Sequence, residues 1–151
     1  MAHALNLQRV HTDGACRGNP GPGGWAWALD SQTFASGPEG ATTNQRMELR
    51  AVIEALRELD QGPIDIVSDS TYVVNCFNNR WYNGWLKRGW RNSQGKPVAN
   101  RDLWEDLFAL TLHVDRVINF SWVKGHSGDV MNDFVDALAT EAADRQRPRH
   151  S

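Results

Sequence analysis

Val10-His-Thr-Asp-Gly-Ala-Cys-Arg-Gly-Asn-Pro-Gly-Pro-Gly-Gly24 is the stretch that decides the fold. Together with residues 5–9, its first part alternates loosely between apolar and polar residues and ends in Asp13-Gly14, which predicts a strand that runs into a turn. Residues 17–24 contain four glycines and two prolines, so we expect neither helix nor strand there. The next apolar residues alternate with small ones, as on a half-buried strand: Trp25, Trp27 and Leu29.

Outward from this stretch, an amphipathic helix is predicted between the capping residues Thr42, Thr43 and Asn44 and the breaker Gly62-Pro63. Its apolar residues recur at helical spacing: Leu49, Val52, Ile53, Leu56 and Leu59. Further strands are predicted at residues 33–36, 64–68 and 117–124, and further helices after Asp69-Ser70, from Asn100 and over residues 131–143.

This order predicts an α/β fold with a mixed five-stranded sheet, in which an antiparallel meander is followed by parallel strands, flanked by helices. A chain of 151 residues suits one compact domain. We expect that domain to cover residues 1–144 and residues 145–151 to form a flexible tail.

The composition is that of an ordinary globular protein, with 40% hydrophobic and 23% charged residues. No apolar run is long enough to cross a bilayer, and the first residues do not have the pattern of a secretory signal. Cys16 and Cys76 are too few for a disulfide framework and do not have the spacing of metal ligands. These features predict a cytoplasmic protein without a membrane partner.

Charge is distributed unevenly. The segment from Ser70 to Arg101 has no acidic residue, so it carries +6 within a chain whose net charge is −2. Its basic residues are Arg80, Lys87, Arg88, Arg91, Lys96 and Arg101. Such an island can bind phosphates, although a solvated basic face explains the charge alone equally well.

Four carboxylates stand at places where an acidic side chain is unusual. Asp13 and Asp69 each end an otherwise apolar strand, and Glu48 and Asp136 each lie along the apolar stripe of a helix. Oxygen ligands without a cysteine cluster favour a hard cation, Mg²⁺ or Mn²⁺. Taken singly, each has a simpler interpretation: a turn former or helix cap for Asp13 and Asp69, a capping-box residue for Glu48, and a surface residue for Asp136.

Four segments of the chain resemble, in the same order, those of the bacterial type 1 ribonuclease H family. They are residues 12–24, 42–49, 68–73 and 122–128, and the resemblance extends from about Val10 to Ala143. It implies a ribonuclease H-like fold and a metal-dependent endonuclease (EC 3.1.26.4) that hydrolyses the RNA strand of RNA/DNA hybrids. The implied products carry 5′-phosphate and 3′-hydroxyl ends, and the implied role is removal of hybrids and RNA primers by a monomer with no obligate protein partner.

The resemblance also implies roles for individual residues. Asp13, Glu48, Asp69 and Asp136 would bind two Mg²⁺ ions for two-metal hydrolysis, with Mn²⁺ as an alternative and Asp13 bridging both ions. His126 would assist proton transfer or product departure, although an exposed loop histidine is the simpler interpretation. The implied substrate-binding residues are Asn19, Thr43, Asn44, Gln45, Trp81, Trp85, Lys87, Arg88 and Arg91, the last five in a basic protrusion at about residues 80–100.

Three positions differ from the residues that are common in the family. They are Ala41, Leu86 and Gln45, and the differences predict weaker or altered substrate contacts. Among the tryptophans, we expect Trp90 and Trp104 to be mainly structural and Trp85 to contact substrate.

Two other functions compete with the nuclease. A silent hybrid-binding module would need the basic residues but not the four carboxylates. A resolvase or integrase would share the clustered acids, but residues 18–24 and 42–49 do not resemble those enzymes. The sequence therefore predicts cleavage of hybrids and no attack on duplex DNA.

Overall fold

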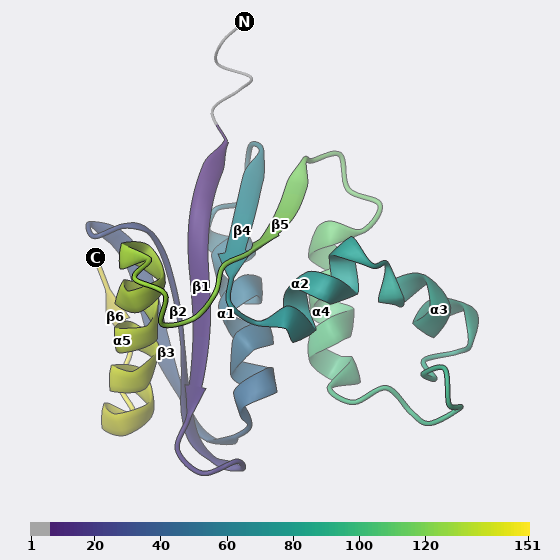
Figure 1. Cartoon of the computed structure of the whole chain (residues 1–151), viewed down its shortest axis with the longest axis horizontal. Helices are drawn as coiled ribbons and strands as arrows, with labels where there is room; N and C mark the ends of the chain where they lie inside the picture. The colour runs from purple at the N-terminus through teal and green to yellow at the C-terminus, as the bar shows by residue number, and fades with distance from the viewer. Residues whose placement is uncertain (1–6) are drawn as a thin grey trace, which may run out of the picture.

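The computed structural model describes residues 7–151, which form one mixed sheet with helices on both faces (Figure 1). Residues 5 and 6 of the predicted first strand lie outside the described part. In chain order the elements are β1 (Gln8–Cys16), β2 (Gly21–Asp30), β3 (Thr33–Thr42), α1 (Asn44–Glu58), β4 (Ile64–Ser68), α2 (Thr71–Asn78), α3 (Trp81–Lys87), α4 (Arg101–Thr111), β5 (Ile118–Trp122), α5 (Val130–Arg145) and β6 (Arg149–His150).

The strand order in the sheet is β5-β4-β1-β2-β3-β6. β1, β2 and β3 are antiparallel neighbours, whereas β4 pairs in parallel with both β1 and β5. His11 is opposite Val67, and two residues later come Asp13 and Asp69. The parallel pairing therefore brings the two aspartates side by side, just beyond the end of β4. The predicted end of the first strand at Asp13-Gly14 was wrong, because β1 continues to Cys16 through its pairing with β2.

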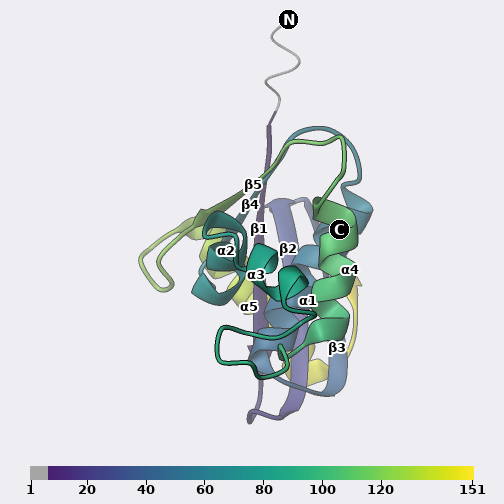
Figure 2. The same ribbon diagram turned by 90° about the vertical axis from the view of Figure 1, so that its right-hand side faces the viewer.

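The two faces of the sheet are covered by different helices (Figure 2). α1 packs on β1 and β2 and against α4, and α5 packs on the opposite face. The larger core lies beneath α1, where Leu49, Val52, Ile53 and Leu56 are buried as the helical spacing predicts. Within the described part of the chain, no helix is long and apolar enough to span a membrane.

The prediction for residues 17–24 was wrong in part, because β2 already begins at Gly21. The turn is confined to residues 17–20. The strand needs glycine where α5 crosses it closely: a Cβ on Gly24 would lie 2.4 Å from the carbonyl oxygen of Ala139. These glycines therefore permit close helix-on-strand packing as well as a turn.

The sheet also has a sixth strand where the sequence predicted a flexible tail. α5 continues to Arg145, and β6 then pairs with the edge strand β3. Ser151 extends this pairing, because its backbone N–H donates to the Phe34 carbonyl at 3.1 Å. The free backbone groups of an edge strand bind such a segment, and a short polar sequence does not reveal this pairing.

Residues 79–100 project from the rest of the molecule (right side of Figure 1). This protrusion contains a short helix, α3, and an extended loop. The loop is closed by a bridge between Arg91 and Pro97.

Candidate active site

Three of the four predicted carboxylates meet at one point. Asp13 comes from β1, Glu48 from α1 and Asp69 from the residue after β4. One carboxylate oxygen of each lies within 4.8 Å of the others. Asp13 and Glu48 are buried, with 4% and 5% of their surface exposed, and Asp69 is half-buried. Residues 21 or more positions apart in the chain thus form one acidic cluster.

The simpler interpretations of these three residues do not hold. Asp13 is not a turn former, because it lies within β1 opposite Ala26 of β2. The N-cap of α1 is Thr43, whose hydroxyl accepts from the Arg46 N–H, so Glu48 lies too far along the helix for a capping box. The N-cap of α2 is Ser70, not Asp69.

A single backbone group fixes the two buried acids. The N–H of Gly14 donates to Asp13 Oδ1 at 2.9 Å and to Glu48 Oε1 at 2.8 Å. The other oxygen, Glu48 Oε2, is buried without a hydrogen-bond partner among the described residues. A buried acceptor without a donor is costly, so this oxygen is suited to a cation.

The surroundings of the three clustered carboxyl groups disfavour their charged forms. Burial, and then repulsion from Glu48, raises the pKa of Asp13. Burial likewise raises the pKa of Glu48 and of Asp69. Arg46, on the same helix as Glu48, could in principle neutralise the cluster, but it forms a bidentate pair with Asp102 at 2.7 and 2.9 Å. None of the described ion pairs involves the cluster, so bound divalent cations would supply the missing positive charge.

Asp136 lies beside the cluster but outside its closely spaced core. It is half-buried on α5, and its negative charge contributes to the raised pKa of Asp13, Glu48 and Asp69. The sequence prediction that this residue faces the other three is therefore compatible with the geometry.

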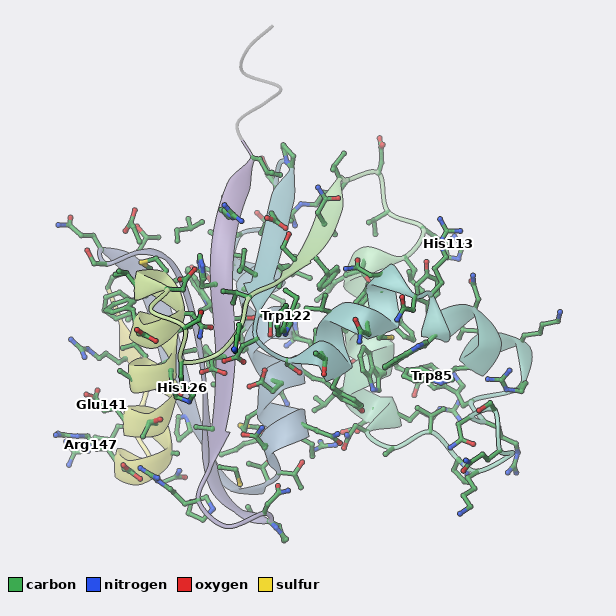
Figure 3. All side chains as sticks on the ribbon, viewed as in Figure 1. Trp85, His113, Trp122, His126, Glu141 and Arg147 are labelled. Carbon is green, nitrogen blue, oxygen red and sulfur yellow. The ribbon has the colours of Figure 1, made fainter. Side chains whose placement is uncertain are left out.

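His126 lies on the loop between β5 and α5, between β1 and α5 in the view of Figure 3. Its side chain is exposed, its φ is +56°, and its charge lowers the pKa of Asp69. The loop passes directly over the site, because a Cβ on the preceding Gly125 would lie 3.0 Å from Asp69 Oδ2.

The sequence analysis missed Asn132 as a member of the site. Asn132 is buried on α5, and its Nδ2 donates to Asp69 Oδ2 at 3.4 Å. This bond orients Asp69 and limits the rise of its pKa. The available signal was its position one helical turn before Asp136, which places both side chains on the same face.

The predicted substrate-binding residues outside the protrusion lie together at the junction of the 17–20 turn and the start of α1. Asn19 Oδ1 accepts from the backbone N–H of Asn44 at 2.9 Å, which joins the two segments. Asn19, Asn44 and Gln45 are exposed, and Thr43 is half-buried as the helix cap.

The protrusion presents four of its five predicted contact residues to solvent. Trp81, Lys87, Arg88 and Arg91 are exposed. Trp85 is only half-buried, and its ring packs on Trp104 at 5.3 Å between centroids (Figure 3 shows its place), so its contact with substrate stays a prediction. This packing attaches the protrusion to the core. Trp104 is fully buried and Trp90 stacks on Phe108, in line with the structural roles expected of them.

The family model described as RNase H matches residues 6–144 of the chain. The chain belongs to the ribonuclease H family. The ribonuclease H of Erythrobacter litoralis is 48% identical over 141 residues, which cover 91% of this chain and 96% of that protein. The ribonuclease H of Thermus thermophilus is 50% identical over 141 residues, which cover 91% of this chain and 84% of that protein.

Among solved ribonucleases H, LC9-RNase H1, a type 1 RNase H with the type 2 active-site motif, has a TM-score of 0.78 and 29% identity. The match covers 96% of this chain and 78% of that one. The predicted family and fold class are thus confirmed. Membership makes the chain a hydrolase of the metal-dependent ribonuclease H class, EC 3.1.26.4.

Proposed function

We propose that this ribonuclease H hydrolyses the RNA strand of RNA/DNA hybrids, with Mg²⁺ held by Asp13, Glu48, Asp69 and Asp136. The observation that carries the proposal is the cluster of three carboxylates within 4.8 Å, which has no described cationic partner. The unpartnered Glu48 Oε2 gives a cation a buried oxygen ligand. Mn²⁺ prefers similar oxygen ligands and is the expected substitute.

The site's own residues hold the reacting groups in place. When bound, divalent ions lower the pKa of an attacking water and offset the negative charge that develops on the phosphate. One carboxylate oxygen of Asp13 lies within 4.8 Å of one from Glu48 and one from Asp69, so Asp13 would share in holding the ions. Gly14 fixes Glu48 through its N–H, and Asn132 fixes Asp69. The exposed imidazole of His126, on the loop that passes over Asp69, would assist proton transfer or product departure.

Substrate selection follows from the exposed polar residues next to the cluster. Asn19, Asn44 and Gln45 would contact base edges and 2′-hydroxyl groups in the minor groove, and Thr43 with Asn19 would receive a phosphate of the DNA strand. Lys87, Arg88 and Arg91 would neutralise further phosphates, and Trp81 would offer a flat surface to sugars or bases. The exposed part of Trp85 would add to this surface, and its packing on Trp104 holds the protrusion against the core.

The proposal extends to the setting of the enzyme. Cys16 and Cys76 are both free, which suits a reducing cytoplasm, and the enzyme would remove hybrids and RNA primers there. We propose that the enzyme acts there as a monomer, which sedimentation analysis at assay concentrations would test.

The decisive experiment compares three labelled duplexes in Mg²⁺: an RNA/DNA hybrid, duplex RNA and duplex DNA. We expect cleavage of the RNA in the hybrid alone, with 5′-phosphate ends identified by mass spectrometry. An Asp13→Asn variant prepared in parallel excludes contaminating nuclease. Equal cutting of all three duplexes, or hybrid binding without any product, would overturn the proposal.

A further inference from the structure

His11 is a buried polar residue that the proposed function does not use. It lies on β1, two residues before Asp13, and only 8% of its surface is exposed. Its Nε2 is 3.5 Å from Asp129 Oδ1, and its Nδ1 is buried without a described partner. Burying two ring nitrogens costs free energy, which a purely apolar side chain would avoid. The presence of a histidine here therefore points to a role for its contact with Asp129.

Asp129 is the residue at which the β5–α5 loop ends and α5 begins. As the N-cap, its Oδ1 accepts from the backbone N–H of Asn132 at 2.8 Å. Asn132 in turn donates from Nδ2 to Asp69 Oδ2. The contacts therefore run from β1 through Asp129 and Asn132 to the carboxylate cluster, where the β5–α5 loop crosses β1 (Figure 1).

The segment between β5 and Asp129 has few internal restraints. Within residues 124–128, Ser127 Oγ donates a hydrogen bond to the Lys124 carbonyl, and no other internal hydrogen bond is described there. His126 and Gly128 both have positive φ, at +56° and +89°. The position of His126 therefore depends on where the two ends of the loop are anchored, and Asp129 is the anchor on the α5 side.

We propose that His11 is a positioning residue: it holds the Asp129 carboxylate and so sets the start of α5 and the His126 loop relative to Asp13 and Asp69. The inference rests on the proposed function for its effect on catalysis. The Asp129 carboxylate is 34% exposed, so without His11 it can rotate toward water. Asn132 and the loop would then lose the contact that ties them, through Asp129, to the central strand β1.

Two substitutions separate this role from simple space filling. His11→Phe keeps an aromatic ring but removes both nitrogens, so it loses the donor and also the unpartnered Nδ1. His11→Gln keeps a donor, because its Nε2 is the same number of bonds from Cα as the histidine Nε2. We expect kcat on a hybrid to fall about tenfold in His11→Phe with KM within about twofold, and to recover in His11→Gln. The melting temperature of His11→Phe should not fall.

A double-mutant cycle identifies the partner. Asp129→Asn keeps a good N-cap but removes the charge that faces His11. If His11 acts through Asp129, His11→Phe should cost little further kcat in the Asp129→Asn background. Multiplicative losses, or an unchanged kcat in His11→Phe, would overturn the inference.

Hydrogen–deuterium exchange gives a readout that does not require activity. In His11→Phe, we expect faster exchange confined to residues 125–133, with β1 and α1 unchanged. Unchanged exchange there sinks the inference even if the enzyme cleaves hybrids as proposed. Conversely, a wild-type protein that cleaves no hybrid would overturn the proposed function, while the exchange experiment would still decide the role of His11.

Discussion

At the scale of single residues, Gly14 connects the backbone of β1 with the side chains of the site. A Cβ added to Gly14 would lie 2.4 Å from the backbone nitrogen of Glu48. We expect Gly14→Ala to push α1 away from β1, to lower the free energy of unfolding by roughly 1–3 kcal/mol and to reduce kcat at least tenfold. Chemical denaturation and hybrid cleavage test this. Gly40, where a Cβ would meet nothing within 4 Å, is the matched control, and equal effects at both positions would contradict the argument.

Also at this scale, Asp13→Asn keeps the shape of the central carboxylate but removes its charge. If the charge stabilises ions that supply several kcal/mol in the transition state, kcat should fall by roughly 10³-fold. Binding of the hybrid should change little, because the exposed groove and protrusion are untouched. Turnover within tenfold of wild type, measured on the same hybrid, would exclude the proposed role of Asp13.

The sequence predicted the site residues whose types and spacing are informative by themselves. Asp13 and Asp69 each follow an apolar run, and Glu48 lies on an apolar stripe, so each was noticeable before the fold was known, although β1 continues past Asp13 to Cys16. Asn132 and His11 were missed because their roles exist only through contacts with Asp69 and Asp129, 63 and 118 positions away in the chain. A polar residue at such a position looks ordinary until the tertiary neighbours are known.

At the scale of elements, local signals predicted the helices well and strand ends poorly. α1 begins at a capping threonine and ends before Gly62-Pro63, and both signals lie within the segment itself. The start of β2 at Gly21 and the whole of β6 depend on pairing with β3 and packing under α5. Strand propensity reflects these distant neighbours, so the sequence pattern could not supply them.

The protrusion is the element on which hybrid affinity should depend. We expect Lys87→Ala with Arg88→Ala to weaken binding, to leave saturated kcat within about twofold, and to flatten the slope of log K against log salt by roughly 1.5–2. Titration at several salt concentrations measures this. Arg57→Ala, which removes an exposed cation on α1, is the control and should leave the slope unchanged. A loss of kcat without a loss of affinity would contradict the binding role.

Trp85 needs a separate prediction, because it belongs both to the protrusion and to the core contact. Trp85→Ala should lower the free energy of unfolding by about 1–3 kcal/mol through lost packing on Trp104. Trp81→Ala, which removes a more exposed ring from the same helix, should weaken hybrid binding with little loss of stability. Thermal melts and binding titrations on both variants distinguish the roles, and equal destabilisation would show that both rings support the fold.

At the scale of the whole molecule, the acidic cluster should make stability depend on pH and metal together. Asp13, Glu48 and Asp69 have pKa values raised by burial, so the folded state holds protons that the unfolded state releases above the ordinary carboxyl pKa of about 4. Their stabilising contribution is present below that pH and is lost as pH rises through the folded-state pKa values. Asp102 and Asp144, whose pKa values are lowered by Arg46 and Arg17, act oppositely but only below about pH 4.

His11 contributes to the pH dependence of stability in the opposite direction. Burial lowers its pKa, so it favours the folded state at higher pH. The difference between wild type and Asp13→Asn cancels that contribution. Without metal, we expect Asp13→Asn to be more stable than wild type by about 1–3 kcal/mol at pH 8 and by less at pH 5. Mg²⁺ should raise the melting temperature of wild type more at pH 8 than at pH 5, because ion binding requires the deprotonated carboxylates, and should have little effect on the variant. Calorimetry at pH 5 and at pH 8, in Mg²⁺ and in EDTA, measures these melting temperatures for both proteins. A metal-induced shift that is the same at both pH values, or the same in Asp13→Asn, would mean that the ions stabilise the fold from somewhere other than this cluster.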